Sequence, residues 1–243
     1  MLSPPTVVHP LTPPALLNHV LTTQAGTTPT TLVICATRDA FLQDLLDSLQ
    51  LHAEQDGPGL QRLIAPTLHN LFTARHVKLI FCASVQTLLA YLTAYHGAVP
   101  SPSVGKGEER ERIVLVNPLR LHAPTSSFSA QGLSRTFAAA VEAAARADAT
   151  LVVAECLATR GASSNEEGDE ETDVEMGEAT VQDEAQENPW EQQVSILNVS
   201  ARRFGSGNAD RAWAGRTVTV KRIAARWFRF RDIEVPGERQ KPD

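Results

Sequence analysis

The sequence has no glycine-rich loop of the kind that binds nucleotide phosphates. Its one Gly-Lys pair, Gly105–Lys106, is followed by Gly107, and Pro100 stands where the first glycine of Gly-x-x-x-x-Gly-Lys-Ser/Thr belongs. No Gly-x-Gly-x-x-Gly follows a strand-like apolar run either. Because these loops hold phosphates with backbone amides that point at the ligand, their absence predicts that the chain has no ready site for a nucleotide.

Motifs for metal-dependent or nucleophilic catalysis are also missing. The sequence contains no His-x-x-x-His, no Cys-x-x-Cys and no Gly-x-Ser-x-Gly. Its three cysteines, Cys35, Cys82 and Cys156, cannot all pair, and they lie in apolar runs. That placement indicates buried thiols in a reducing compartment. We therefore expect no catalytic residue, no metal site and no cofactor.

Long hydrophobic runs and a secretory signal are absent as well. No uncharged apolar stretch reaches the about 18 residues of a membrane span, and the first residues have neither a basic region nor an apolar core. With 42% apolar and 21% charged residues, the composition is that of a globular protein. We expect a soluble intracellular chain with one core and no contact with a membrane.

Charge is divided unevenly along the chain, although the formal net charge is only −6. Residues 1–160 hold equal numbers of basic and acidic residues, 11 of each. Residues 161–191 hold 12 acidic residues and no basic one, whereas residues 201–243 hold 11 basic and 5 acidic residues. The chain is therefore a neutral body, an acidic insert and a basic end, and each part needs its own interpretation.

Apolar runs that alternate with helical patterns predict an α/β fold. Residues 31–36 are a short unbroken apolar run, typical of a strand buried on both faces, and residues 77–82, 112–117 and 149–156 are further strand-like apolar segments. Between them, apolar residues recur at helical spacing, as in Leu133, Phe137 and Val141 of an Ala-rich segment. Strands that alternate with helices form parallel βαβ units. We expect a mostly parallel sheet flanked by helices.

The two ends of the chain and the insert interrupt this pattern. Residues 1–30 are rich in Pro and Thr, which predicts a loose N-terminal arm with one short helix. Residues 31–236 then form a single domain, interrupted by the acidic insert 161–191 and followed by a tail at 237–243. The insert is acidic and almost free of apolar residues, so we expect it to be disordered. Residues 194–199, 217–221 and 226–231 are expected as antiparallel strands that finish an edge of the sheet.

The basic end has two interpretations that the residues leave open. Its cations are either the hydrated face of alternating strands or, together with Trp213, Trp227, Phe228 and Phe230, a nucleic-acid surface in which cations meet phosphates and rings stack on bases. The candidate contact residues for nucleic acid or a partner are Arg202, Arg203, Arg216, Lys221, Arg222, Arg226, Arg229 and Arg231.

The order of segments between residues 112 and 156 resembles a known family. An apolar run ends in Asn117–Pro118, a loop leads to the Ala-rich helix, and the next apolar run ends at Glu155. This is similar to the middle of a RecA-like recombinase core, in which an apolar Walker B strand ends in Asp and the next strand ends in a polar residue that faces the nucleotide. The segments 32–46 and 194–231 also resemble parts of that core. The resemblance covers about residues 31–231 and implies a RecA-like fold.

Departures from the family pattern change what the resemblance implies about activity. Walker A is missing, and the Walker B acid position is Asn117, whose amide carries no charge to hold Mg²⁺. The acidic insert takes the place of a DNA-binding loop and would repel phosphate. The resemblance therefore implies a pseudo-ATPase rather than an enzyme that forms filaments and hydrolyses ATP.

Small RecA-like chains without ATPase motifs occur as accessory subunits, which gives three functional hypotheses. The first is a scaffold subunit of a homologous-recombination mediator of the Shu type, acting in DNA repair in the nucleus as a hetero-oligomer with another RecA-like paralog and contacting DNA or RNA through the basic end. The second is a subunit of the accessory ring of Elongator, which acts in tRNA wobble-uridine modification and would place the chain in the cytoplasm. The third is an α/β enzyme with a site around Asn117, Glu155 and Ser126–Ser129, at the carboxyl ends of strands.

Overall fold

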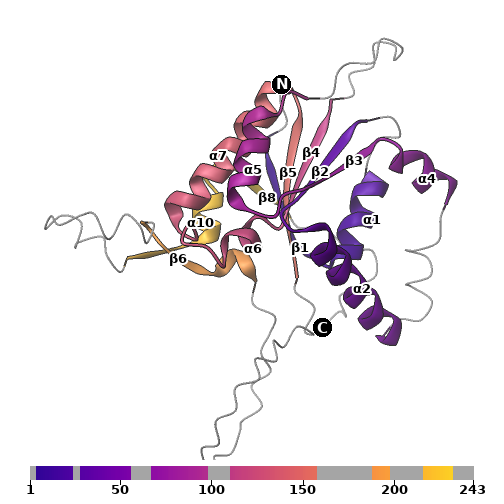
Figure 1. Cartoon of the computed structure of the whole chain (residues 1–243), viewed down its shortest axis with the longest axis horizontal. Coiled ribbons are helices and arrows are strands. Elements are labelled where there is room, and N and C mark those ends of the chain that lie inside the picture. Colours follow the sequence, from indigo (N-terminus) through magenta and orange to yellow (C-terminus); the bar gives the residue numbers. More distant parts are fainter. Residues whose placement is uncertain are drawn as a thin grey trace, which may run out of the picture.

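The main sheet of the protein has six strands, all parallel, in the order β3-β2-β4-β5-β1-β8 (Figure 1). The computed structural model describes residues 4–23, 28–55, 67–97, 110–157, 188–197 and 216–231. A separate antiparallel sheet of two strands consists of β6 and β7. The strands are β1 (Thr6–Leu11), β2 (Thr30–Ile34), β3 (Val77–Phe81), β4 (Arg112–Val116), β5 (Thr150–Cys156), β6 (Gln193–Ser195), β7 (Thr217–Thr219) and β8 (Arg229–Arg231).

Helices cover both faces of the six-stranded sheet (Figure 1). Side chains of α1 and α2 form the core on one face, and those of α5, α7 and α10 form the core on the other. In the described residues no helix is both long enough and apolar enough to cross a bilayer. The helices are α1 (Pro13–Thr23), α2 (Arg38–Gln55), α4 (Leu68–Ala74), α5 (Val85–Ala94), α6 (Pro118–His122), α7 (Ala130–Arg146), the 3₁₀ helix η1 (Pro189–Glu191) and α10 (Val220–Ala224).

The α/β class and the central elements confirm the sequence prediction. The four strand-like apolar segments form β2, β3, β4 and β5, and the Ala-rich segment forms α7, with Leu133 and Phe137 fully buried. Strands in the middle of a parallel sheet are covered on both faces, which is why their sequences show no polar alternation. The architecture, a parallel sheet flanked by helices with a separate antiparallel pair, is consistent with a RecA-like core.

The N-terminal segment differs from the loose arm that its composition suggested. Residues 6–11 form β1, which lies between β5 and β8 inside the sheet, and residues 13–23 form the expected short helix as α1. Val7 is fully buried in the core of one face, and Val8 is buried in the core of the other. Two neighbouring strands supply the backbone hydrogen bonds that order this segment, so its prolines do not prevent a strand.

The C-terminal segment also differs from the expected row of antiparallel strands. β6 and β7 pair antiparallel as expected, but they form their own small sheet, whereas β8 is parallel to β1. Residues 220–224 form α10, because Val220, Ile223 and Ala224 are buried at helical spacing. Phe228 precedes β8 and packs edge-on against Phe137, with ring centroids 5.2 Å apart, so the adjacent Trp227 and Phe228 are not in one strand. The acidic insert lies almost wholly outside the described residues, and the tail at 237–243 lies outside them altogether.

The position of β1 predicts the effect of shortening one of its side chains. Val7→Ala should lower the free energy of unfolding by roughly 2 kcal/mol, because it leaves a cavity in a closely packed core. Leu68→Ala is the matched control, since Leu68 is 86% exposed and its truncation should change stability by less than about 0.5 kcal/mol. Urea unfolding followed by circular dichroism measures both values. Equal stability of the two variants would mean that residues 6–11 are not part of the sheet.

Candidate functional site at the carboxyl edge of the sheet

The carboxyl ends of parallel strands are where α/β proteins normally bind ligands, in the crevice between strands whose helices leave toward opposite faces. In this chain β2 and β4 are such a pair, because α2 leaves β2 toward one face and α7 follows β4 on the other. Asn117, which follows β4, and Glu155, near the end of β5, both lie at this edge and are both buried. The structure therefore brings together two of the residues that sequence reasoning selected.

Asn117 connects the ends of two strands. Its side-chain Oδ1 accepts a hydrogen bond of 2.6 Å from the backbone N–H of Cys156, and its own N–H donates to the carbonyl of Ala154 at 2.8 Å. Its backbone is left-handed, with φ 58° and ψ 40°, a conformation that Asn tolerates better than most residues. The amide oxygen that would correspond to a metal-binding position is thus used inside the protein.

Glu155 occupies the start of α6. Its Oε1 accepts a hydrogen bond of 2.5 Å from the N–H of Leu119, and the N–H of Arg120 is a second donor to the carboxyl group. Burial raises the pKa of Glu155 to about 8, more than these backbone hydrogen bonds and the nearby Arg120 lower it. The carboxyl group is therefore mostly protonated at neutral pH. Its oxygens accept hydrogen bonds from the first turn of α6 and are not available to hold a cation.

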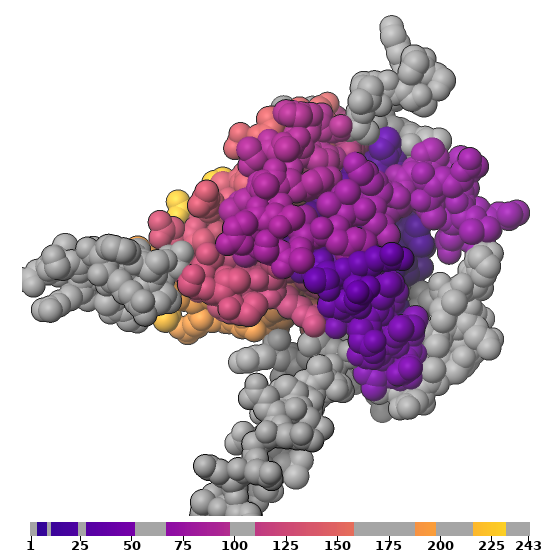
Figure 2. All heavy atoms as spheres, viewed as in Figure 1, coloured from indigo at the N-terminus to yellow at the C-terminus, as the bar shows by residue number. Residues whose placement is uncertain are grey.

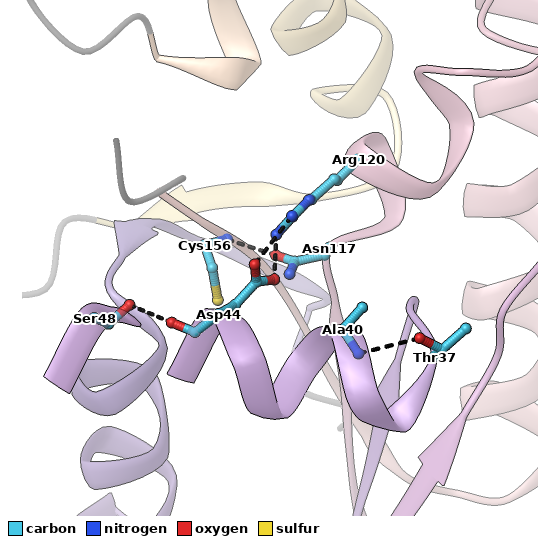
Figure 3. Close-up of polar contacts among 7 residues, drawn as sticks. All are labelled: Thr37, Ala40, Asp44, Ser48, Asn117, Arg120 and Cys156. Atoms are coloured by element: carbon cyan, nitrogen blue, oxygen red, sulfur yellow. Dashed lines mark hydrogen bonds and ion pairs between the residues drawn. The ribbon is translucent and has the colours of Figure 1, made fainter. Parts of the chain in front are cut away.

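An ion pair joins the two helices that flank the crevice between β2 and β4. The guanidinium group of Arg120 on α6 contacts both carboxylate oxygens of Asp44 on α2, with Nη2 3.1 Å from Oδ1 (Figure 3). Ser48 donates to the backbone carbonyl of Asp44 at 2.7 Å, one helical turn further along. The acid that would be free to bind a metal or a water molecule here is neutralised by a cation of the same chain.

At the other helices that begin at this edge, prolines or side-chain caps remove part of the amides that a phosphate could use. α1 follows β1 after Thr12 alone, and its first two residues, Pro13 and Pro14, have no N–H group. At the start of α2 the hydroxyl of Thr37 accepts from the N–H of Ala40 at 3.2 Å (Figure 3). At the start of α5 Ser84 caps its own helix in the same way. Each described helix start at the carboxyl edge therefore has prolines or a side-chain cap in its first turn.

The three thiols are buried and unreactive, as the sequence predicted. Cys35, Cys82 and Cys156 are free and less than 9% exposed. Burial raises the pKa of Cys35 well above its ordinary value, raises that of Cys82, and raises that of Cys156 to about 12. Because the thiolate is the nucleophile and the metal ligand, these cysteines are protonated and inert near neutral pH.

Side chains of the loop between α6 and α7 hold that loop in place. His122, fully buried, donates from Nδ1 to the carbonyl of Ser127 and accepts at Nε2 from the hydroxyl of Thr136. The Ser129 hydroxyl accepts from the N–H of Gly132 and so caps α7. The serines of 126–129 that the enzyme hypothesis named include this cap, and sequence reasoning missed His122 because a lone His carries no spacing signal.

The predicted basic contact residues that the structure describes lie on its last segment, which ends in β8 and is separated from β4 by β5 and β1. Arg202 and Arg203 lie outside the described residues. The remaining six are all exposed, on β7, α10, β8 and the segments beside them: Arg216, Lys221, Arg222, Arg226, Arg229 and Arg231. In the described part of the chain, no group of three or more His, Cys, Asp or Glu side chains is arranged to hold a metal ion.

The comparisons with known proteins give no relative for this chain. No protein-family model matches the sequence, and no curated protein is significantly similar to it. Interpretation of the carboxyl edge therefore depends on its own geometry.

Protonation of Glu155 predicts a pH-dependent stability. The folded-state pKa of about 8 lies above the ordinary value of 4.5 for this side chain, so the folded chain holds a proton that the unfolded chain releases between these pH values. The free energy of unfolding should fall as pH rises through this window, by roughly 1 kcal/mol per pH unit. Glu155→Gln, which keeps an acceptor for the Leu119 N–H, should flatten the dependence.

The measurement is urea unfolding at pH 5.5, 6.5 and 7.5. Glu142→Gln is the matched control, because Glu142 is an exposed glutamate on α7, paired with Arg146, and its replacement should leave the wild-type pH dependence in place. A wild-type slope that survives in Glu155→Gln would show that another group titrates.

The prolines and side-chain caps at the helix starts predict that this edge binds nucleotide weakly. We expect ATP and Mg²⁺ to bind more weakly than about 1 mM, which corresponds to a binding free energy of roughly −4 kcal/mol, and we expect no ATP hydrolysis. Isothermal titration calorimetry and a phosphate-release assay on the purified chain measure both. Micromolar affinity for ATP would contradict the interpretation of this edge as closed.

Proposed function

We propose that the chain is a non-catalytic RecA-like subunit of a multi-subunit assembly, in the first place a homologous-recombination mediator complex in DNA repair. The observation that carries the proposal is the chemistry of the carboxyl edge. Asn117 is bonded to Cys156, Glu155 caps α6, and the edge is bridged by the Asp44–Arg120 ion pair. A fold that normally binds a ligand at this edge has its polar groups engaged with its own backbone and side chains.

A subunit without catalysis needs a surface for its partners, and the exposed apolar side chains supply one. Among the described residues, every large apolar side chain that is exposed belongs to α2, α4 or β3. We call this set the apolar side: Leu42, Leu46, Leu51, Leu68, Leu71, Phe72 and Leu79. α1 contacts both α2 and α4, so the three helices share one face of the sheet. Figure 2 shows α2 and α4 on the outside of the molecule.

The edge strand strengthens the case for a protein partner at the apolar side. β3 pairs with β2 alone in the described part of the sheet, and Leu79 in its middle is 49% exposed. Exposed apolar residues gathered in one region mark protein interaction sites in soluble proteins. The occupant that we propose is another RecA-like α/β subunit, which would cover α4 and β3 together. Residues 6–23 form β1 and α1 and are therefore not a free arm that could hold such a partner.

The same features suit the accessory ring of Elongator, which remains the second candidate. Both assemblies use RecA-like chains as scaffolds, and the identity of the partner distinguishes them. A recombination mediator would place the chain in the nucleus, whereas the Elongator ring would place it in the cytoplasm. The third hypothesis, an α/β enzyme around Asn117 and Glu155, has less support because both side chains are bonded to backbone groups.

Partner capture tests the proposal. Full-length tagged chain should co-purify from its own cells with a RecA-like subunit, identified by mass spectrometry, and Leu71→Ser/Phe72→Ser should lose that subunit by at least tenfold. The reason is that the variant removes apolar area from the centre of α4 without touching the buried core. The matched control, Gln131→Ser/Arg135→Ser, changes two exposed residues of α7 on the opposite face and should capture normally.

Each outcome has a defined consequence. Recombinase paralogs among the partners support the first candidate, and Elongator subunits support the second. A chain that purifies without any RecA-like partner contradicts the proposal, and so does equal recovery by both double variants, which would place the partner elsewhere.

A further inference from the structure

The outer edge at β8 is unusually rich in arginine. Residues 216–231 contain six basic residues and no acidic one, and all six side chains are exposed. Lys221 is paired with Glu191, with Nζ 2.7 Å from Oε1. No ion pair within the described residues involves the four arginines that we call the basic edge: Arg222, Arg226, Arg229 and Arg231.

β8 presents two of these arginines side by side. Side chains alternate along a strand, so Arg229 and Arg231 project to the same face, about 7 Å apart along the strand. Phe230 projects to the other face, where its ring packs edge-on against Trp190 with centroids 5.5 Å apart. The arginines therefore stay in solvent because the residue between them is the one that anchors the strand.

The helix α10 and the turn after it supply the remaining cations on the opposite face of the same edge. Val220, Ile223 and Ala224 fix α10 in the core, which leaves Arg222 and Arg226 in solvent. α10 packs near β8, as shown by Lys221 Nζ, which lies 5.9 Å from the centre of the Phe230 ring. Arg222 and Arg226 thus add two exposed cations on the segment that directly precedes β8.

The backbone of β8 adds to this surface. The N–H of Arg229 donates to the carbonyl of Pro5 at 2.9 Å, so in a parallel ladder the amides of Arg229 and Arg231 face β1. The N–H and the carbonyl of Phe230 then point outward in the plane of the sheet, whereas the two arginine side chains stand on one face of it. The Phe230 N–H is therefore a backbone donor for an anionic oxygen close to both arginines.

We propose that the basic edge binds the phosphate backbone of a nucleic acid. Guanidinium groups bind phosphate through paired N–H donors, and the cations of the basic edge are all arginine. Arginines about 7 Å apart on one strand match the repeat of phosphates along an extended nucleic-acid strand. Trp227 and Phe230 are packed against the core rather than free to stack on bases, so recognition is through phosphates and independent of sequence.

The chain as a whole is acidic, so the basic edge attracts nucleic acid only at short range. With a net charge of −6 the protein is repelled by nucleic acid at long range, and binding depends on contacts at the basic edge. The inference goes beyond the proposed function, because it depends neither on the closed carboxyl edge nor on the identity of a protein partner.

Fluorescence anisotropy of the full-length chain with labelled 20-nucleotide oligo(dT), oligo(rU) and a 20-base-pair duplex tests the inference. The expected result is binding that weakens steeply between 50 and 200 mM NaCl. The quadruple variant, with Arg222, Arg226, Arg229 and Arg231 changed to Gln, should bind at least tenfold more weakly. Its salt slope should fall by up to about 3, since each phosphate contact on a single strand contributes about 0.7. The three probes show whether DNA, RNA or duplex is preferred.

Control variants separate charge from folding. Arg38→Gln/Arg75→Gln removes two exposed arginines beside α2 and α4 and should bind as the wild type does. Arg229→Lys/Arg231→Lys keeps the charge and should keep the salt slope while losing part of the affinity. If the quadruple variant melts at a lower temperature than the wild type, oligonucleotide affinity and salt slope are measured instead on two double variants, Arg222→Gln/Arg226→Gln and Arg229→Gln/Arg231→Gln.

Three outcomes overturn the inference. The first is a wild-type chain that shows no salt-dependent binding to any of the three probes. The second is equal affinity for the quadruple variant and the Arg38/Arg75 control. The third is a Glu-rich peptide that binds the same arginines at least as tightly as the oligonucleotides, which would assign the basic edge to an acidic protein.

Discussion

The buried carboxyl group of Glu155 holds the carboxyl edge of the sheet together. It reaches from β5 to the first free amides of α6, and it is 2% exposed. Those amides reach it because Asn117 turns the chain in a left-handed conformation directly after β4. α6 in turn carries Arg120 to Asp44 on the far side of the crevice. If Glu155 lost its acceptor oxygens, two buried donors would be left unpaired and the position of α6 would no longer be fixed.

Much of the fold could be predicted from the sequence, and the errors have physical causes. β2, β4, β5 and α7 were predictable because a strand covered on both faces must be apolar throughout, and a helix on a sheet must be apolar on one side. β3 is a partly exposed edge strand that contains Lys78, and its remaining apolar residues were enough to indicate a strand. β1 was missed because Pro10 and the neighbouring prolines suggest a loose chain, whereas pairing on both sides orders the segment. Residues 217–224 alternate at first and then follow helical spacing, and so short a stretch fits either pattern.

The position of the candidate site could be predicted from the sequence, but its hydrogen bonds and its ion pair could not. Asn117 and Glu155 were selected because they end apolar runs, and parallel strands bring such ends to one edge. Their partners could not be predicted, since Arg120 and Asp44 are 76 residues apart in the sequence and a single sequence carries no sign of such pairing. The basic residues were predicted as exposed, and the six that the structure describes are exposed. Their grouping around one edge strand depends on α10, of which only Val220 and Lys221 fell within a predicted strand.

The place of β1 in the sheet has a consequence for how the chain is made. β1 is synthesised before the other strands, yet its two neighbours are β5 and β8. Thr6 therefore cannot pair until Val152 has been synthesised on one side and Arg229 on the other. Contacts between such distant residues slow folding, because a long loop must close before they form. On the ribosome the β2–β3–β4 part of the sheet can assemble while the first strand still lacks both partners. The nascent chain therefore carries β1 without a partner until β5 has emerged, and with one side unpaired until β8 follows, so a chaperone that shields β1 would be expected to raise the yield of folded protein.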